Sequence, residues 1–176
     1  MSWAITGTPG VGKTSVATRL ELDYPIVHLN DLIKINSFSV GRDPARGSTI
    51  ADIDALTDWF ADQPTNVIIE SHVAHFLPVD RIIVLRCHPD ELRERLAARA
   101  AEHDGPTAMI EENVEAERLD LILSEAIERH GFDGVFELDT SGRPVSAIVS
   151  EVERVIRGEF EPRVGVVSFL EEDDPR

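Results

Sequence analysis

The chain has 176 residues, of which 42% are hydrophobic and 28% are charged. This length favours one domain with a substantial core, and this balance excludes a largely disordered chain. The 33 acidic residues outnumber the 17 basic ones and give a net charge of −16 at pH 7. So acidic a chain repels phosphates, which argues against bare nucleic acid as a direct partner.

The basic residues are almost all arginine, because Lys13 and Lys34 are the only lysines. An acidic, lysine-poor composition resembles that of proteins from salt-loving archaea, in which concentrated salt screens the repulsion between surface charges. We therefore interpret the charge as an adaptation to the solvent. The alternative is an acidic face that binds a basic partner.

A cytoplasmic location is expected from three features of the sequence. No apolar run approaches the roughly 18 residues that a membrane helix needs, so no direct membrane contact is expected. The first residues, MSWAITG, lack the basic region of a secretory signal. Cys87 is the only cysteine, which excludes an intrachain disulfide and fits a reducing compartment.

Apolar runs and helical patterns alternate along the chain. Five runs are typical of buried strands: residues 3–6, 26–29, 67–69, 82–85 and 135–138. Helices are predicted over residues 13–22, 31–35, 51–61, 89–101, 108–129 and 145–156. Residues 37–49 are rich in Gly, Pro, Ser and Asp, which favours irregular structure. The alternation predicts an α/β fold with a parallel sheet that helices cover on both faces.

The segment after Gly158 differs from the rest of the chain. It carries an apolar patch followed by acidic residues. It can dock on the core, pair at a sheet edge or stay mobile, and the sequence does not choose among these.

The segment Gly7-Thr8-Pro9-Gly10-Val11-Gly12-Lys13-Thr14 matches the phosphate-binding loop G-x-x-x-x-G-K-[ST]. A strand precedes it and a helix follows it, so backbone N–H groups can surround a polyphosphate at the positive end of the helix. Lys13 can reach the β- and γ-phosphates, and the Thr14 hydroxyl can bind Mg²⁺. The alternative is a Gly/Pro turn that only joins the two elements.

Glu70-Ser71-His72 closes the third predicted strand. Parallel sheets bind ligands at the carboxyl ends of their strands, so Glu70 and His72 are expected beside the loop. A carboxylate there can hold Mg²⁺ directly or through water. The alternatives are a helix cap for Glu70 and a hydrogen-bonded structural role for His72.

Further charged residues are candidates at the sequence level. Arginines suit phosphate clamps because their donors are forked, and the candidates are Arg42, Arg46, Arg86, Arg95 and Arg99. A solvated acidic helix face is expected from Glu111, Glu112, Glu115 and Glu117. No role follows for His28, His75, His88, His103 and His130.

Together these residues resemble those of one family, the ribosome-assembly adenylate kinases of archaea and eukaryotes. These are nucleoside monophosphate kinases of the isoenzyme-six type. The P-loop and the acid-x-His sequence at a strand end carry the resemblance, which extends from Trp3 to about Ile156. Further matches are Asp31-Leu32, Phe76-Leu77-Pro78, Val84-Leu85-Arg86, Glu94-Arg95-Leu96, Arg99 and Asn113-Val114. Where the family usually has Asp and Gly, this chain has Glu70 and Asn30.

The resemblance implies a P-loop NTPase fold with a five-stranded parallel sheet. Residues 1–157 would form one kinase domain, with an arm for the nucleoside monophosphate over about 30–55 and a lid over about 99–108. Residues 158–176 would form an acidic tail. The implied reaction is ATP + AMP ⇌ 2 ADP with Mg²⁺, together with an ATPase activity. The implied biology is maturation of the small ribosomal subunit, with a small-subunit ribosomal protein or the pre-ribosome as partner.

The resemblance also implies roles for individual residues. The implied catalytic residues are Lys13, Glu70, His72 and Arg99. The implied ATP-binding residues are Gly7, Gly10, Gly12, Lys13, Thr14, Ser15 and Arg99. Asp31, Arg42 and Arg46 would bind AMP, and Thr14 and Glu70 would hold the metal ion.

Other functions stay open at this point. An ATPase assembly factor would use hydrolysis to switch a protein complex, with kinase turnover incidental. A small-metabolite kinase is compatible with Asn30 in place of Gly. A GTPase is disfavoured because the guanine signature Asn-Lys-x-Asp does not occur in the sequence.

Overall fold

The computed structural model describes residues 1–35, 38–44, 49–103, 107 and 109–170. Five strands form one parallel sheet in the order β2-β5-β1-β6-β7. Their bounds are β1 (Trp3–Thr6), β2 (Ile26–His28), β5 (Ile68–Glu70), β6 (Arg81–Arg86) and β7 (Val135–Asp139). The predicted fold class and the five core strands are therefore confirmed.

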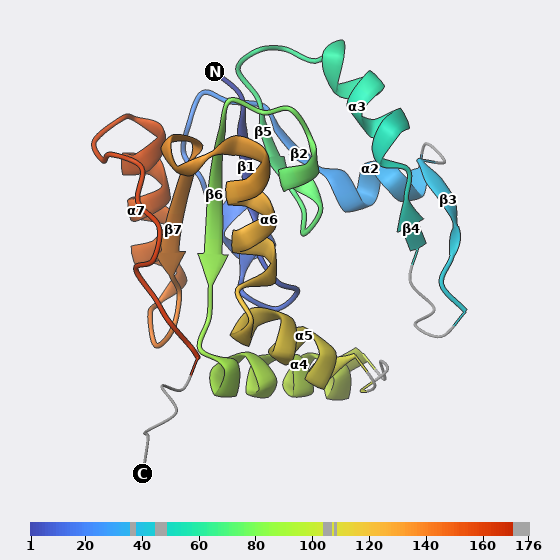
Figure 1. Ribbon diagram of the computed structural model, residues 1–176, viewed down its shortest axis with the longest axis vertical. Coiled ribbons are helices and arrows are strands. Elements are labelled where there is room, and N and C mark those ends of the chain that lie inside the picture. Colours follow the sequence, from blue (N-terminus) through green and yellow to red (C-terminus); the bar gives the residue numbers. More distant parts are fainter. Residues whose placement is uncertain (36–37, 45–48, 104–106, 108, 171–176) are drawn as a thin grey trace.

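Helices cover both faces of this sheet (Figure 1). The helices are α1 (Lys13–Ala17), α2 (Leu29–Ile35), α3 (Ile53–Ala61), α4 (Pro89–His103), α5 (Ile110–Arg118), α6 (Leu121–His130) and α7 (Val145–Ile156), with 3₁₀ turns η1 (Ala74–Phe76) and η2 (Phe132–Gly134). Within the described residues, no helix has the length and apolar character needed to cross a membrane.

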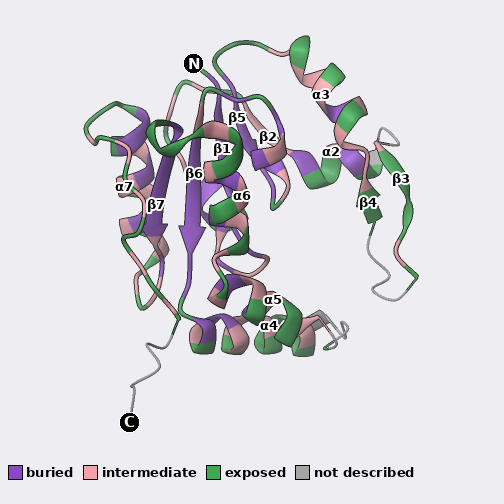
Figure 2. Cartoon of the chain, in the orientation of Figure 1, coloured by how far each residue is buried: buried purple, intermediate pink, exposed green. Residues whose placement is uncertain are grey.

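The core is split in two by the pleat of the sheet, which sends alternate side chains to opposite faces. In β1, Trp3 and Ile5 face a cluster that includes residues of α1 and α7, whereas Ala4 faces a cluster that includes Leu56 of α3 and Ala126 of α6. Figure 2 shows β1, β6 and β7 as part of the buried centre of the molecule. Because both faces are covered, the strands are mainly apolar, as the sequence pattern predicted, and the charged residues Arg86 and Glu137 within them are buried as a pair.

All five strands run in one direction, so their carboxyl ends lie at one edge of the sheet. In Figure 1, α4 and α5 lie below the arrowheads of β6 and β7 at this edge. The loop between β1 and α1 opens there too. The fold thus brings together segments that are far apart in sequence.

Two predictions of local structure are wrong. Residues 37–49 were expected to be irregular, but β3 (Ser39–Arg42) and β4 (Thr49–Ala51) pair as an antiparallel ribbon. This ribbon projects from the sheet beside α2 and α3 (Figure 1). The single helix predicted over 108–129 is two helices, because Asp120 takes a left-handed conformation with φ 53° and ends the first of them.

The segment after α7 runs back along β7. Arg163 forms a parallel bridge with Phe136, and its carbonyl accepts a hydrogen bond of 2.9 Å from the Glu137 N–H. Farther on, the Phe169 ring packs edge-on against His88. Of the three arrangements left open by the sequence, the described part of this segment therefore shows two: it pairs at the sheet edge, and Phe160 and Val164 pack against the core.

Candidate active site

The loop between β1 and α1 needs glycine for two separate reasons. Gly7, Gly10 and Gly12 have φ values of 134°, 100° and 107°, which residues with a side chain rarely adopt. A Cβ on Gly7 would lie 2.3 Å from the Leu85 carbonyl oxygen, and one on Gly10 would lie 2.8 Å from a methyl carbon of Leu92. The loop conformation therefore depends on the glycine spacing of the motif.

Lys13 is buried at the start of α1. Its Nζ donates hydrogen bonds to the carbonyl oxygens of Gly7 at 2.7 Å and Thr8 at 3.0 Å. Burial lowers the pKa of Lys13 to about 8, although Glu70 and Glu117 favour its charged form. Lys13 thus supplies a positive charge that its own loop holds in place.

Glu70 lies at the end of β5 and is buried. Its Oε1 accepts a hydrogen bond of 3.2 Å from the Thr14 hydroxyl, and its Oε2 lies 2.8 Å from Nδ1 of His28. Hydroxyl and carboxylate oxygens are the ligands that Mg²⁺ prefers. Thr14 and Glu70 therefore fit a magnesium ion bound together with a nucleotide.

His72 and Asn30 are two further residues that line the same site. His72 is exposed as a whole residue, but the protein partly shields its imidazole from water. This desolvation and, to a smaller extent, the Lys13 ammonium lower the pKa of His72 to about 4. The ring is therefore neutral at pH 7 and can accept a hydrogen bond. Asn30 Oδ1 accepts a hydrogen bond of 2.9 Å from the Ser71 hydroxyl, which ties the segment after β2 to the segment after β5.

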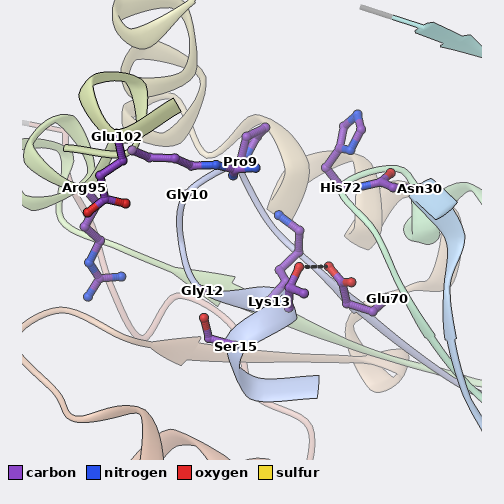
Figure 3. A pocket seen from close by; sticks show the side chains of 12 residues that line it. Pro9, Gly10, Gly12, Lys13, Ser15, Asn30, Glu70, His72, Arg95 and Glu102 are labelled. Atoms are coloured by element: carbon purple, nitrogen blue, oxygen red, sulfur yellow. Dashed lines mark hydrogen bonds between the residues drawn. The ribbon is translucent and has the colours of Figure 1, made fainter. Parts of the chain in front are cut away.

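These groups surround one cavity of about 510 Å³. It is lined by Pro9, Gly10, Gly12, Lys13, Thr14, Ser15, Asn30, Glu70, His72, Arg95, Arg99 and Glu102. In Figure 3, Lys13, Glu70 and His72 lie on one side of the loop, and Arg95 and Glu102 lie on the other. The residues proposed for catalysis thus share one space.

Asp31 and Arg42, two of the residues expected to bind AMP, do not line this cavity. Asp31 is exposed and forms a 3.8 Å ion pair with Lys34. Arg42 is exposed on β3 and does not line the cavity. Arg46 lies outside the described residues. The structure therefore does not bring Asp31 and Arg42 to the P-loop.

Arg86, a candidate phosphate clamp, has a structural position instead. Its side chain is buried and donates to Glu117 and Glu137 at 2.8 Å each, and also to Asp120. Four of its five N–H donors are used in these contacts and in one to the Glu117 carbonyl, and the side chain is 1% exposed, so it is not available to a nucleotide outside the core. Arg95 does line the cavity, but it is held by Glu91 at 2.5 Å and by the Thr140 carbonyl at 3.1 Å.

Glu117 corrects the expectation of a solvated acidic face. It is only 2% exposed, and its Oε2 accepts a hydrogen bond of 2.5 Å from the hydroxyl of Thr8 in the P-loop. Its Oε1 accepts from the backbone N–H of Cys87 at 3.0 Å as well as from Arg86. This buried carboxylate therefore fixes the P-loop to the end of β6.

The sequence did not reveal a second cavity of about 250 Å³ on the α7 side of the P-loop. Arg143 and Val145 line it, together with Val11, Val16 and Ile148. One signal was available, because Gly142-Arg143-Pro144 follows the fifth strand at the same edge of the sheet. This cavity shares Gly10, Gly12, Ser15 and Arg95 with the larger one.

Solved structures share this architecture. A shikimate kinase from Bacteroides thetaiotaomicron is 18% identical, with a TM-score of 0.54 over 89% of this chain and 98% of its own. A sulfotransferase from Alicyclobacillus acidocaldarius is 15% identical, with a TM-score of 0.54 over 97% of this chain and 86% of its own. At this identity the likeness concerns the fold alone.

Sequence comparisons are more specific. Residues 4–120 match the family model described as "AAA domain". Proteins named "Putative adenylate kinase" are 44% identical in Natronomonas pharaonis, over 97% of this chain and 99% of the relative, and 42% identical in Halobacterium salinarum, over the same shares. A protein of this name from Pyrococcus furiosus is 38% identical over 94% of this chain and 89% of its own length. The chain therefore belongs to the AAA-domain family, and it also belongs to the family of proteins that carry this adenylate kinase name.

Proposed function

We propose that this chain is an adenylate kinase that transfers the terminal phosphoryl group of ATP to AMP and releases two molecules of ADP. One observation carries the proposal: Lys13, Thr14, Glu70, His72 and Arg99 line a single cavity at the P-loop. The names of the relatives point to the same activity. Phosphoryl transfer depends on positioning and charge stabilisation, and these side chains supply both.

Each residue has a role in the proposed reaction. The loop N–H groups bind the phosphates, and Lys13, which the Gly7 and Thr8 carbonyls hold in place, stabilises the transferred charge with its third N–H donor. Thr14 and Glu70 would hold Mg²⁺, which when bound neutralises phosphate charge. Arg99, exposed on α4 four residues before its end, can reach the nucleotide from the edge of the cavity.

The second cavity suits the adenine base of ATP. Its aliphatic side chains, Val11, Val16, Val145 and Ile148, offer apolar contact to a flat ring, and Arg143 offers a guanidinium for stacking. Ser15 lies at the junction with the larger cavity, where the phosphates would bind. One ATP molecule can thus extend across both cavities.

We propose roles for the remaining regions from the family resemblance described above. Residues 30–55, which include the β3–β4 ribbon, would bind AMP through Asp31, Arg42 and Arg46. Residues 99–108 would form a lid that excludes water, because water competes with AMP for the phosphoryl group. Residues 1–157 would be the kinase domain, and residues 158–176 its tail.

The first test is product analysis in concentrated salt with Mg²⁺ and ATP, with and without AMP. Adenylate kinase chemistry gives two ADP for each AMP consumed, at a rate far above the AMP-free rate. Lys13→Ala provides the inactive control. ADP and free phosphate formed at a rate that AMP does not change would contradict the proposal.

A second activity, ATP hydrolysis, is favoured by His72. Its ring is neutral at pH 7 and borders the cavity beside Glu70, so it can orient a water molecule or the acceptor. His72→Ala should leave the ATP dissociation constant unchanged and lower the turnover by about 100-fold, the lower end of the effect of losing a general base. A loss of ATP affinity alone would make His72 a binding residue.

A place in small-subunit maturation is proposed from the acid-x-His sequence and the further motif matches given above. The partner would be a small-subunit ribosomal protein or the pre-ribosome. Such proteins are basic as a class, and a chain with a net charge of −16 attracts basic partners. Stimulation of ATP hydrolysis by purified small-subunit proteins would support this role, and no stimulation by any of them would contradict it.

A further inference from the structure

Both oxygens of the buried Glu70 carboxylate have partners from other elements. Oε1 faces the Thr14 hydroxyl at 3.2 Å, and Oε2 lies 2.8 Å from Nδ1 of His28. His28 is the last residue of β2 and is the register partner of Glu70 across the β2–β5 pair. The side chain of His28 is 30% exposed, whereas that of Glu70 is 3% exposed. The contact is therefore set by strand pairing rather than by a flexible loop.

The direction of this hydrogen bond follows from its chemistry. A carboxylate only accepts, so Nδ1 of His28 must be the donor. The Oε2 atom thereby faces His28 and has one lone pair engaged, whereas Oε1 faces the Thr14 hydroxyl at the start of α1. A glutamate has one more rotatable bond than an aspartate, so a second contact is needed to fix which oxygen faces outward.

We propose that His28 is a positioning residue that makes Glu70 present a single carboxylate oxygen, and that it thereby favours Mg²⁺ over Ca²⁺ in the nucleotide complex. This inference rests on the proposed function, because Thr14 and Glu70 are taken as the residues that hold the metal. Mg²⁺ requires compact octahedral coordination and keeps most of its waters, whereas Ca²⁺ accepts both oxygens of one carboxylate. A carboxylate whose second oxygen is committed to an imidazole N–H fits the smaller ion.

The test compares ADP binding to the full-length protein in concentrated salt with Mg²⁺, with Ca²⁺ or with EDTA. Calorimetry would give the dissociation constants for wild type, His28→Leu and His28→Gln. Leucine removes the donor and keeps the bulk, whereas the glutamine amide can still donate to Glu70. His88→Gln, at an exposed position outside the site, is the control for loss of a histidine.

We expect equal ADP affinities in EDTA for all variants, which also shows that each one is folded. With Mg²⁺, His28→Leu should bind ADP about 10-fold more weakly, the lower end of the effect of losing a partner of a metal ligand. Its preference for Mg²⁺ over Ca²⁺ should shrink by a similar factor. His28→Gln should retain most of the ADP affinity with Mg²⁺ and most of the preference for Mg²⁺ over Ca²⁺.

Three results would overturn the inference. In the first, His28→Leu gains as much ADP affinity from Mg²⁺ as wild type does and keeps the full preference for Mg²⁺ over Ca²⁺. It could instead lose ADP affinity equally in EDTA, which would show a merely structural role. A wild type that gains nothing from Mg²⁺ would remove the metal assignment together with the role of His28. By contrast, absent AMP phosphorylation with metal-dependent ADP binding intact would overturn the proposed kinase function and leave His28 in place.

Discussion

The phosphate-binding edge of the sheet consists of the P-loop with Lys13 and Thr14 and of Glu70 at the end of β5. It differs from the β3–β4 ribbon in how firmly its charged side chains are held. Lys13 and Glu70 are buried, and hydrogen bonds to the loop, to Thr14 and to His28 fix them in place. Every residue of β3, including Arg42, is exposed. The first region thus holds its charged groups in place by hydrogen bonds, whereas Arg42 on the ribbon is exposed to solvent.

This difference separates two kinds of effect. Groups fixed in advance act on the transition state at no cost of reorganisation, so their loss lowers turnover. Exposed groups gain little from each contact because water and salt screen them, so their loss changes affinity modestly. The predictions below test this separation, beginning with the largest expected effect.

Lys13→Ala removes the buried charge at the centre of the phosphate-binding edge. Turnover should fall by about 10²-fold or more, the scale of losing one donor to the transition state. Steady-state kinetics with ATP and AMP measure it. Arg157→Ala, which removes an exposed cation at the end of α7, should leave turnover near the wild-type value. Near-normal turnover in Lys13→Ala would contradict the assignment of the P-loop as the catalytic centre.

The phosphate-binding edge also depends on a buried histidine. Nδ1 of His75 lies 3.1 Å from the Thr6 hydroxyl at the end of β1, and Nε2 lies 3.0 Å from a carboxylate oxygen of Glu125 on α6. Burial, with a smaller contribution from Arg129, lowers the pKa of His75 to about 4. The ring is neutral in the folded protein, donating from Nε2 and accepting at Nδ1.

The unfolded chain therefore takes up this proton at a higher pH than the folded protein does. The contribution of His75 to stability is complete above about pH 6.5 and is lost as the pH falls toward 4. Between pH 7 and pH 5 the contribution of His75 to the free energy of unfolding should fall by about 2 kcal/mol. Urea titrations at both pH values measure it. His75→Gln should reduce this dependence, and an unchanged slope would show that His75 is not its source.

The sequence identified the phosphate-binding edge better than the ribbon, for a physical reason. The loop glycines, Lys13 and Thr14 form one contiguous motif whose spacing the backbone geometry requires. The strands of the parallel sheet are mainly apolar because helices cover both faces. In contrast, β3 and β4 are only four and three residues long and exposed, so they carry no apolar alternation that a pattern could detect.

The errors at individual residues arise from contacts between distant segments. Arg86 was a candidate clamp because arginine suits phosphate, but Glu117, Asp120 and Glu137 surround it in the fold. Glu117 belongs to an acidic helical run, and only the approach of α5 to the P-loop makes it a buried partner of Thr8. Neither position could be deduced from local periodicity.

The α7 side of the P-loop allows a test that leaves the phosphate-binding edge intact. Val145→Asp places a carboxylate in the second cavity, where it should repel ATP and remove apolar contact with the base. The helix itself should tolerate it, because an acidic residue in the first turn is favourable. The KM for ATP should rise about 10-fold, the order of 1–2 kcal/mol for a lost apolar contact, with the KM for AMP nearly unchanged.

Ser146→Asp is the matched control, because it adds the same charge one residue later, at an exposed position outside the cavity. It should leave both KM values near those of wild type. If both variants raise the KM for ATP equally, the effect is long-range repulsion and the base binds elsewhere.

The smallest effect is expected on the ribbon. Arg42→Ala should raise the KM for AMP up to about fivefold, because an exposed charge contact contributes about 1 kcal/mol or less. Turnover at saturating AMP and ATP hydrolysis without AMP should stay at the wild-type values, since Lys13 and Glu70 are untouched. Arg157→Ala serves again as the control for loss of an exposed cation. A fall in AMP-free hydrolysis would show that the ribbon acts on the phosphate-binding edge itself, and the separation between the two regions would fail.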